Sequence, residues 1–213
     1  CGREYALGGS EMAIRDSACF ALIPACFPEY LSGLGRAPEA QVYRHFLRRL
    51  RQARLVLTPS HETAADAVRL AGVDPGRIRV VPLAAPASAA PRGAPPEGPY
   101  VLFTGAIEPH KNAGLAVEAI ARAMPPVRLL MAGPWSARRA QRLREHAARV
   151  GAADRVAWLG LVEAGRLAAL RAGATAVRAP ARQAGFGLPL LAALAAGARR
   201  PAPCSPAPVP RTQ

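Results

Sequence analysis

The stretch Tyr100-Val-Leu-Phe-Thr-Gly-Ala-Ile-Glu-Pro-His-Lys-Asn112 decides the expected fold, because an apolar run ends there in a glycine turn and a helical pattern follows. Lys111 in that turn is the only lysine among the 28 basic residues of the chain. A basic residue just before a helix presents a positive charge beside a helix N-terminus, where phosphate groups bind. The alternative is that an arginine-rich composition has left one lysine here by chance.

The bulk composition is that of a folded protein. The chain has 213 residues, enough for one large domain or for one and a half ordinary domains of ~150 residues. A hydrophobic content of 51% with 20% charged residues excludes overall disorder. No apolar run reaches the ~18 residues that a membrane span needs, and the first residues lack a signal-peptide layout. The four cysteines form neither a dense framework nor a CxxC pair, so we expect free thiols in a reducing cytoplasm.

The net charge of +14 suits either an anionic partner or a solvated basic surface. Aromatic residues make up only 5% of the chain, which weighs against a base-stacking platform for single-stranded nucleic acid. Much of the charge falls in two helical stretches, residues 43–54 and 137–146. We favour solvated helix faces and expect no specific nucleic-acid partner. Peripheral contact of these arginines with an anionic membrane, at its inner face, stays open as an alternative.

Two alternations of strands and helices divide the chain. The first is expected as a helix over 41–53, a strand over 54–58, a helix over 60–71 and a strand over 77–82. The second has strands over 100–104, 127–132, 155–159 and 175–179, with helices over 113–123, 136–150, 163–172 and from about 188. This alternation predicts an α/β fold with Rossmann-like parallel sheets. The expected units are 1–83 and 99–197, joined by a Pro/Ala-rich linker over 84–98 and followed by a proline-rich, irregular tail over 198–213.

Three features of the second unit follow its predicted strands: residues 105–112, 133–135 and 184–188. Ligands of parallel α/β sheets bind beyond the carboxyl ends of the strands, so we expect these features to converge on one crevice. Gly185-Phe-Gly187 opens a helix at Leu188, and its small residues would let backbone N–H groups approach an anion. The alternative is a tight loop closed by a buried Phe186.

In these motifs the chain resembles the family-4 retaining glycosyltransferases of GT-B architecture. The resemblance is carried by residues 105–112, by Asp154-Arg-Val-Ala-Trp-Leu-Gly160 and by Gly185-Phe-Gly-Leu-Pro-Leu-Leu191, in that order. It implies a C-terminal nucleotide-sugar-binding lobe over 99–197 and an incomplete N-terminal, acceptor-side lobe over 1–83. The implied donor-binding residues are Gly105, Lys111, Gly185, Phe186, Gly187 and Leu188.

The resemblance also implies an activity. It is hexosyl transfer, as by a mannosyltransferase of polysaccharide biosynthesis, from a nucleotide sugar to a saccharide or lipid-linked acceptor, with retention. It needs neither a metal ion nor a cofactor, because the cationic side chain and the helix dipole would stabilise the departing diphosphate.

The chain departs from this family where acid–base groups are expected. The family's histidine and paired glutamates correspond here to Phe20, Ala184 and Ala192. None of these side chains can exchange a proton, so we assign no catalytic residue. One alternative is therefore a catalytically impaired or inactive fragment, from a truncated or disrupted gene, that at most binds nucleotide sugar. Another is a basic peripheral protein of membranes or nucleic acid.

Several other residues have structural interpretations. His110 and His146 are predicted to be exposed, on a turn and on a polar helix face. Trp135 and Trp158 are predicted to pack in the core, and Ser60 to be a helix N-cap.

Overall fold

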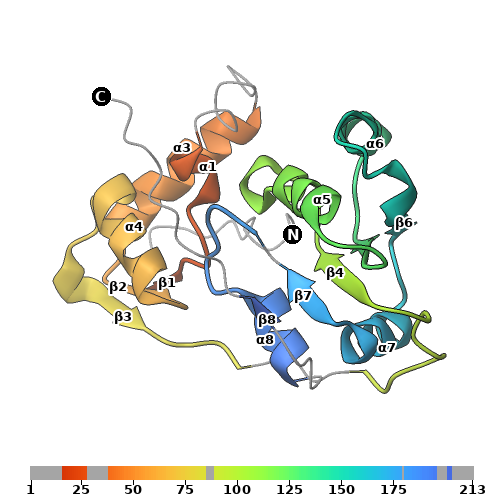
Figure 1. Cartoon of the computed structure of the whole chain (residues 1–213). Helices are drawn as coiled ribbons and strands as arrows, with labels where there is room; N and C mark the ends of the chain where they lie inside the picture. The colour runs from red at the N-terminus through yellow and green to blue at the C-terminus, as the bar shows by residue number, and fades with distance from the viewer. Residues whose placement is uncertain (1–15, 28–37, 85–88, 179, 196–200, 203–213) are drawn as a thin grey trace. The chain divides into compact units, whose positions relative to one another are not determined.

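The computed structural model describes residues 16–27, 38–84, 89–178, 180–195 and 201–202 of the chain (Figure 1). The chain divides into two compact units, Cys1–Pro82 and Leu83–Gln213. Both units are built on parallel sheets with helices, which confirms the predicted α/β class. Within the described ranges, no helix is both long and apolar enough to cross a membrane.

The first unit is built on a three-stranded parallel sheet in the order β1-β2-β3. The strands are β1 (Asp16–Ala18), β2 (Leu55–Thr58) and β3 (Ile78–Val80), and the helices are α1 (Ile23–Cys26), α3 (Pro38–Gln52) and α4 (His61–Ala71). The sequence patterns did not predict β1 and α1, because elements of three or four residues carry almost no periodicity. The core of the unit consists of buried apolar residues from these elements and from the segments next to them: Cys19, Leu22, Leu50, Ala53, Val56, Ala67, Ala71 and Val73.

The ends of α4 follow the predicted capping chemistry. The Ser60 hydroxyl accepts a hydrogen bond of 3.1 Å from the backbone N–H of Thr63, and this confirms the N-cap. Gly72 ends the helix in the left-handed conformation, with φ of 67°.

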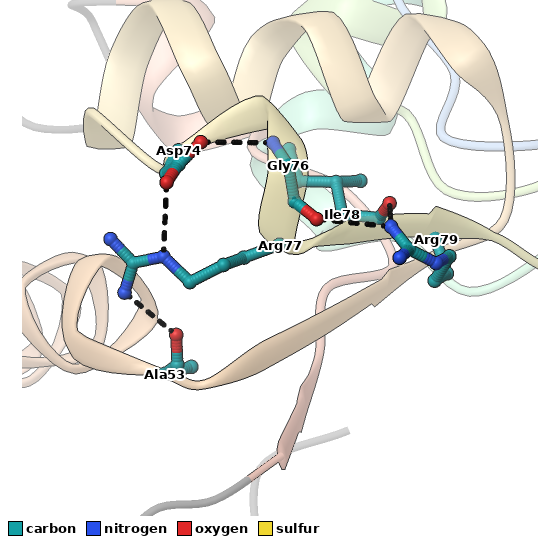
Figure 2. A network of polar contacts seen from close by, with 6 residues as sticks. All are labelled: Ala53, Asp74, Gly76, Arg77, Ile78 and Arg79. Carbon is teal, nitrogen blue, oxygen red and sulfur yellow. Dashed lines mark hydrogen bonds and ion pairs between the residues drawn. The ribbon is translucent and has the colours of Figure 1, made fainter.

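A turn of 3-10 helix over Pro75–Arg77 leads into β3 and is held by side-chain contacts (Figure 2). The Asp74 carboxylate accepts a hydrogen bond of 2.9 Å from the backbone N–H of Gly76 and lies 3.6 Å from Nε of Arg77. The same guanidinium donates to the carbonyl of Ala53, just beyond α3, so Arg77 ties the end of α3 to the start of β3.

The second unit contains a five-stranded parallel sheet in the order β6-β5-β4-β7-β8. The strands are β4 (Tyr100–Thr104), β5 (Arg128–Ala132), β6 (Val156–Gly160), β7 (Ala176–Arg178) and β8 (Pro201–Ala202). The helices are α5 (Ala113–Arg122), α6 (Ala137–Arg149), α7 (Ala164–Gly173) and α8 (Leu188–Ala195). The strand order reverses at β4, because the chain runs outward through β5 and β6 and then returns to β7. This reversal is the switch point at which doubly wound sheets bind ligands.

Alternating residues of β4 and β5 contribute to two separate cores. On one face, Phe103 and Met131 belong to a cluster with residues of α5 and α6. On the other face, Leu102 and Leu130 pack with residues of α7 and α8. The sheet is therefore covered on both sides, as strands rich in continuous apolar residues predict. Trp135 and Trp158 pack against the first cluster, as predicted, with their rings edge to face and 6.5 Å apart.

Two segments of this unit differ in part from the sequence expectation. Pro201–Ala202 forms a two-residue strand, β8, within the tail expected to be irregular. It lies at the edge of the sheet, where a proline without an N–H is tolerated. In the proline-rich stretch before β4, the N–H of Arg92 donates to the carbonyl of Gly165 at 2.9 Å, so this stretch packs on α7.

Arg155 joins three parts of the unit before β6. Its guanidinium donates to the carbonyl of Ala123 at 2.9 Å and twice to the carbonyl of Val127, at 2.8 and 3.2 Å. The residue therefore holds the segment between α5 and β5 against the turn that precedes β6.

Candidate functional site

A cavity of about 230 Å³ lies at the carboxyl ends of β4 and β5, at the switch point of the second sheet. Ligand pockets usually measure ~300–1,000 Å³, so this cavity fits part of a nucleotide sugar rather than all of it. Its walls combine strand ends, the loop after β6, one face of α7 and the start of α8. The lining residues are Thr104, Gly105, Ala132, Gly133, Pro134, Leu161, Val162, Leu167, Arg171 and Pro189.

Two glycines bring the turns after β4 and β5 together at this cavity. Gly105 and Gly133 have φ of 129° and 151°, which side chains rarely adopt. A Cβ atom on Gly133 would lie 2.2 Å from the carbonyl oxygen of Gly105, so only hydrogen fits between the two turns. The N–H of Gly105 donates to the carbonyl of Ala132 at 2.9 Å, and the N–H of Gly133 donates to that of Gly160 at 2.8 Å. Gly105 is a predicted site residue, whereas the role of Gly133 in this contact was not predicted.

Lys111 lies in a short 3-10 turn, Pro109–Lys111, directly before α5. Asn112 follows in the left-handed conformation, with φ of 53°, and α5 begins at Ala113. Lys111 is half-buried and stands beside a helix N-terminus, as the sequence suggested. It is not among the residues that line the cavity at the strand ends. Its contact with a diphosphate therefore stays a prediction.

The prediction that His110 is exposed was wrong. Its side chain is only 7% exposed, because the 3-10 turn directs it inward. Burial, together with the charge of Lys111, lowers the pKa of His110 to about 4, so the ring is neutral at pH 7. His146 is half-buried as well, and its Nε2 lies 3.3 Å from a carboxylate oxygen of Glu118 on α5. Packing between α5 and α6 removes it from the polar face on which it was expected.

The predicted glycine loop leads into α8 at the same edge of the sheet. Gly187 has φ of 81°, and its carbonyl accepts from the N–H groups of Leu190 and Leu191, at 2.9 and 3.1 Å. Phe186 is half-buried, so it is not a fully buried plug. A backbone hydrogen bond of 2.7 Å, from Arg182 to the carbonyl of His110, joins this loop to the Lys111 turn. Pro189, in the first turn of α8, is the residue of this helix that lines the cavity.

Arg171 is the cavity residue that the sequence patterns did not reveal. It lies in the last turn of α7, four residues after Leu167, so both side chains share the helix face that lines the cavity. Burial lowers the pKa of its guanidinium, and its Nε is buried without a hydrogen-bond partner among the described residues. The only signal for it in the sequence was its position, four residues after an apolar residue in a predicted helix.

A second cavity, of about 330 Å³, adjoins the turn that contains Lys111. It is lined by the turn, the start of α5 and α6, with Arg139 and Arg142 as its cations. Glu108 forms an ion pair with Arg139, which connects the turn to α6. Among the described residues, no group of three or more histidines, cysteines, aspartates or glutamates is placed to hold a metal ion.

Comparison with protein families identifies the chain. The model for "Glycosyl transferases group 1" matches residues 86–199, more than half of the sequence. The chain belongs to this family. The matched residues include the cavity and the whole of the sheet except the edge strand β8.

Curated relatives of the chain include two bacterial proteins named D-inositol 3-phosphate glycosyltransferase. The protein from Acidothermus cellulolyticus is 32% identical over 162 residues, which are 67% of this chain and 36% of the relative. The protein from Xylanimonas cellulosilytica is 32% identical over 160 residues, 67% of this chain and 38% of the relative. The match therefore spans little more than a third of the length of these relatives.

Solved structures show that the group 1 glycosyltransferase chain has the GT-B type of fold. WaaG, a glycosyltransferase involved in lipopolysaccharide biosynthesis, has a TM-score of 0.67 and 19% identity, covering 91% of this chain and 58% of WaaG. Anabaena HepE in complex with UDP-glucose has a TM-score of 0.64 and 16% identity, covering 90% of this chain and 54% of HepE. At these identities the likeness establishes the fold of the chain, not its ligand.

The three positions of the chain where the family's acid–base groups were expected carry apolar side chains. Phe20 is 54% exposed, Ala184 is half-buried and Ala192 is buried in α8. Neither unit therefore offers a proton-transfer group at these positions.

Proposed function

We propose that this chain binds a nucleotide sugar in its second unit and serves the retaining transfer of the sugar to a saccharide or lipid-linked acceptor. One observation carries the proposal: the cavity at the switch point, whose lining includes both glycines of the contact between the turns, lies within the segment that matches the glycosyltransferase family. The chain covers only 36% and 38% of the length of its two relatives. The proposal therefore concerns binding of the sugar donor before it concerns the complete reaction.

The proposed roles follow from charge and backbone geometry. Lys111 contacts the donor diphosphate, Gly105 lets it approach, and the backbone of Gly185, Phe186, Gly187 and Leu188 faces it at the start of α8. In the transfer, the bond between the sugar's anomeric carbon and the diphosphate oxygen breaks, and its electron pair leaves with the diphosphate. An acceptor hydroxyl forms the new bond on the same face and passes its proton to the departing diphosphate or to solvent. Positive charge placed at the leaving group stabilises this transition state.

No residue is assigned to the acceptor's proton. Phe20, Ala184 and Ala192 cannot take it, and loss of an acid–base group costs ~10²–10⁴-fold in rate. We therefore expect donor binding to be far more robust than turnover. The proposal also includes no metal ion or cofactor, so activity and binding should both persist in EDTA.

Calorimetry with UDP and UDP-glucose tests the donor site, since HepE has been solved with UDP-glucose. We expect binding by the native chain and a loss of about tenfold or more in Lys111→Ala, on the scale of a charge-assisted hydrogen bond. Arg149→Ala is the matched control, because Arg149 is an exposed cation on α6 outside both cavities. Equal binding by the native chain and Lys111→Ala would refute the role of Lys111.

Turnover is measured separately, as release of UDP and formation of a glycoside. The acceptors include D-inositol 3-phosphate, which is part of the names of both relatives. Proton NMR of the product's anomeric centre reports retention. A product with inverted configuration would refute the retaining assignment, and donor binding without any product would limit the function to binding.

Helix α6 supports a second proposal, peripheral contact with anionic membrane at its cytoplasmic face. It carries five arginines and one glutamate in 13 residues. Such a face attracts anionic lipid by ~1 kcal/mol per arginine near the surface. Co-sedimentation with phosphatidylserine vesicles, lost at high salt, is the expected result. Equal sedimentation with neutral phosphatidylcholine vesicles would contradict it.

A further inference from the structure

We propose that Arg171, rather than Lys111 alone, provides the cationic contact for a phosphate group inside the cavity at the strand ends. The inference rests on the proposed donor-binding function and adds a residue to the same site. It starts from the composition of the cavity wall. Of the residues that line this cavity, Arg171 is the one that carries a charge.

The charge of Arg171 lacks a partner within the described part of the chain. A guanidinium has five N–H donors, yet no hydrogen bond or ion pair joins that of Arg171 to another described residue, and its Nε is shielded from solvent. Three other arginines of the unit do have an acidic partner: Arg92 lies near Glu163, Arg122 near Glu118 and Arg139 near Glu108. The C-terminal end of α7, where Arg171 lies, offsets part of the cost of this charge.

The surroundings of Arg171 suit an anion with an apolar body. Leu161, Val162 and Leu167 provide an apolar wall next to it. Gly105 and Gly133 also line the cavity and carry no side chain, so a ligand there meets the backbone of the two turns. A nucleoside diphosphate has both parts: a flat heterocycle for the apolar wall and phosphate oxygens for a planar guanidinium, which they bind in pairs. The ligand class is therefore a nucleoside diphosphate, with its phosphate on Arg171.

The test uses the full chain and three probes: inorganic pyrophosphate, UDP and uridine. Calorimetry of Arg171→Gln should show pyrophosphate and UDP bound about 10- to 100-fold more weakly, as expected for loss of a hydrogen bond to a charged group. Uridine, which has no phosphate, should bind equally to both proteins. Arg166→Gln is the matched control on the same helix, because Arg166 donates to the carbonyl of Ala94 and does not line the cavity.

Thermal unfolding of the ligand-free proteins gives a second readout. Because Arg171→Gln removes an unpaired, desolvated charge, the variant should be at least as stable as the native chain. Reduced stability of the variant with unchanged pyrophosphate binding would show a structural role and overturn the inference. Failure of the native chain to bind pyrophosphate would also overturn it.

The outcomes separate this inference from the proposed function. If UDP binding is lost in Lys111→Ala but unchanged in Arg171→Gln, the donor site stands and the role of Arg171 is refuted. If pyrophosphate binding depends on Arg171 while no nucleotide sugar binds, the inference stands and the glycosyltransferase proposal fails.

Discussion

Substitution of Gly133 by alanine tests whether the contact between the two glycine turns holds the site together. The new Cβ atom would lie 2.2 Å from the oxygen, 2.6 Å from the carbon and 3.0 Å from the nitrogen of Gly105. Comfortable carbon contacts begin near ~3.5 Å, so the turns must separate by roughly 1 Å. The neighbour is backbone, which cannot rotate away as a flexible side chain can.

The expected cost has two parts. Overpacking of this kind costs ~1–3 kcal/mol. Alanine at φ of 151° adds backbone strain of ~1–3 kcal/mol. The sum, about 4 kcal/mol, is a large fraction of the ~5–15 kcal/mol that stabilises an ordinary domain. We expect the second unit of Gly133→Ala to unfold at a much lower urea concentration than that of the native chain.

Tryptophan fluorescence is the assay, because both tryptophans of the chain, Trp135 and Trp158, lie in the second unit and pack on its core. The control is Gly151→Ala, where φ is 73° but no atom lies within 4 Å of the added Cβ. That variant carries only left-handed strain, ~1–2 kcal/mol. If Gly133→Ala loses no more stability than Gly151→Ala, the contact between the turns is not a structural constraint and the argument fails.

Three further predictions concern single side chains. Arg155→Ala should destabilise the second unit by about 2–3 kcal/mol, because its charged hydrogen bonds hold two backbone carbonyls; urea unfolding with fluorescence detection measures it, and Arg155→Lys should recover part of the loss. Because the folded pKa of His110 is lowered to about 4, the unfolded chain binds more protons below pH ~6.5, so stability should fall by up to about 3 kcal/mol as the pH drops toward 4. His110→Gln should remove this part of the pH dependence, and an unchanged pH profile would contradict the assignment. Burial raises the pKa of Cys19 to about 12 and that of Cys26 to about 11, so iodoacetamide at pH 8 should modify both at least ~100-fold more slowly than a free cysteine peptide; rapid labelling seen by peptide mass spectrometry would contradict it.

The elements that the sequence predicted well are those whose own residues carry the pattern. β4 has the predicted bounds, Tyr100–Thr104, because it is buried on both faces and reads as an unbroken apolar run. β1, over Asp16–Ala18, has no such run. It is a strand because Ser17 pairs with Val56, a partner far along the chain. Pairing of this kind is a tertiary property, so a local pattern does not contain it.

The exposure of individual turn residues was also beyond the sequence. His110 and Lys111 are neighbours in one turn, with similar polar character, yet the first is buried and the second half-buried. The 3-10 geometry of the turn, and the backbone hydrogen bond from Arg182, decide which side chain points inward. A histidine beside a polar residue in a turn is usually exposed. Here, packing of the turn against the loop before α8 buries His110 instead.

The two candidate cations of the site show which property identifies a binding residue. Lys111 attracts attention in the sequence because it is the only lysine, whereas Arg171 is one of many arginines and is inconspicuous there. In the folded chain the order changes. Of the arginines whose side chains the structure describes, Arg171 is the one whose pKa lies below its usual range, as a result of burial, and it lines a cavity without a described partner. That Lys111 is the only lysine reflects the composition of the sequence. An unpaired, desolvated charge, in contrast, has an energetic cost that a bound anion would relieve. The cost of desolvation, which only the fold reveals, is therefore the stronger physical reason to place a phosphate beside Arg171.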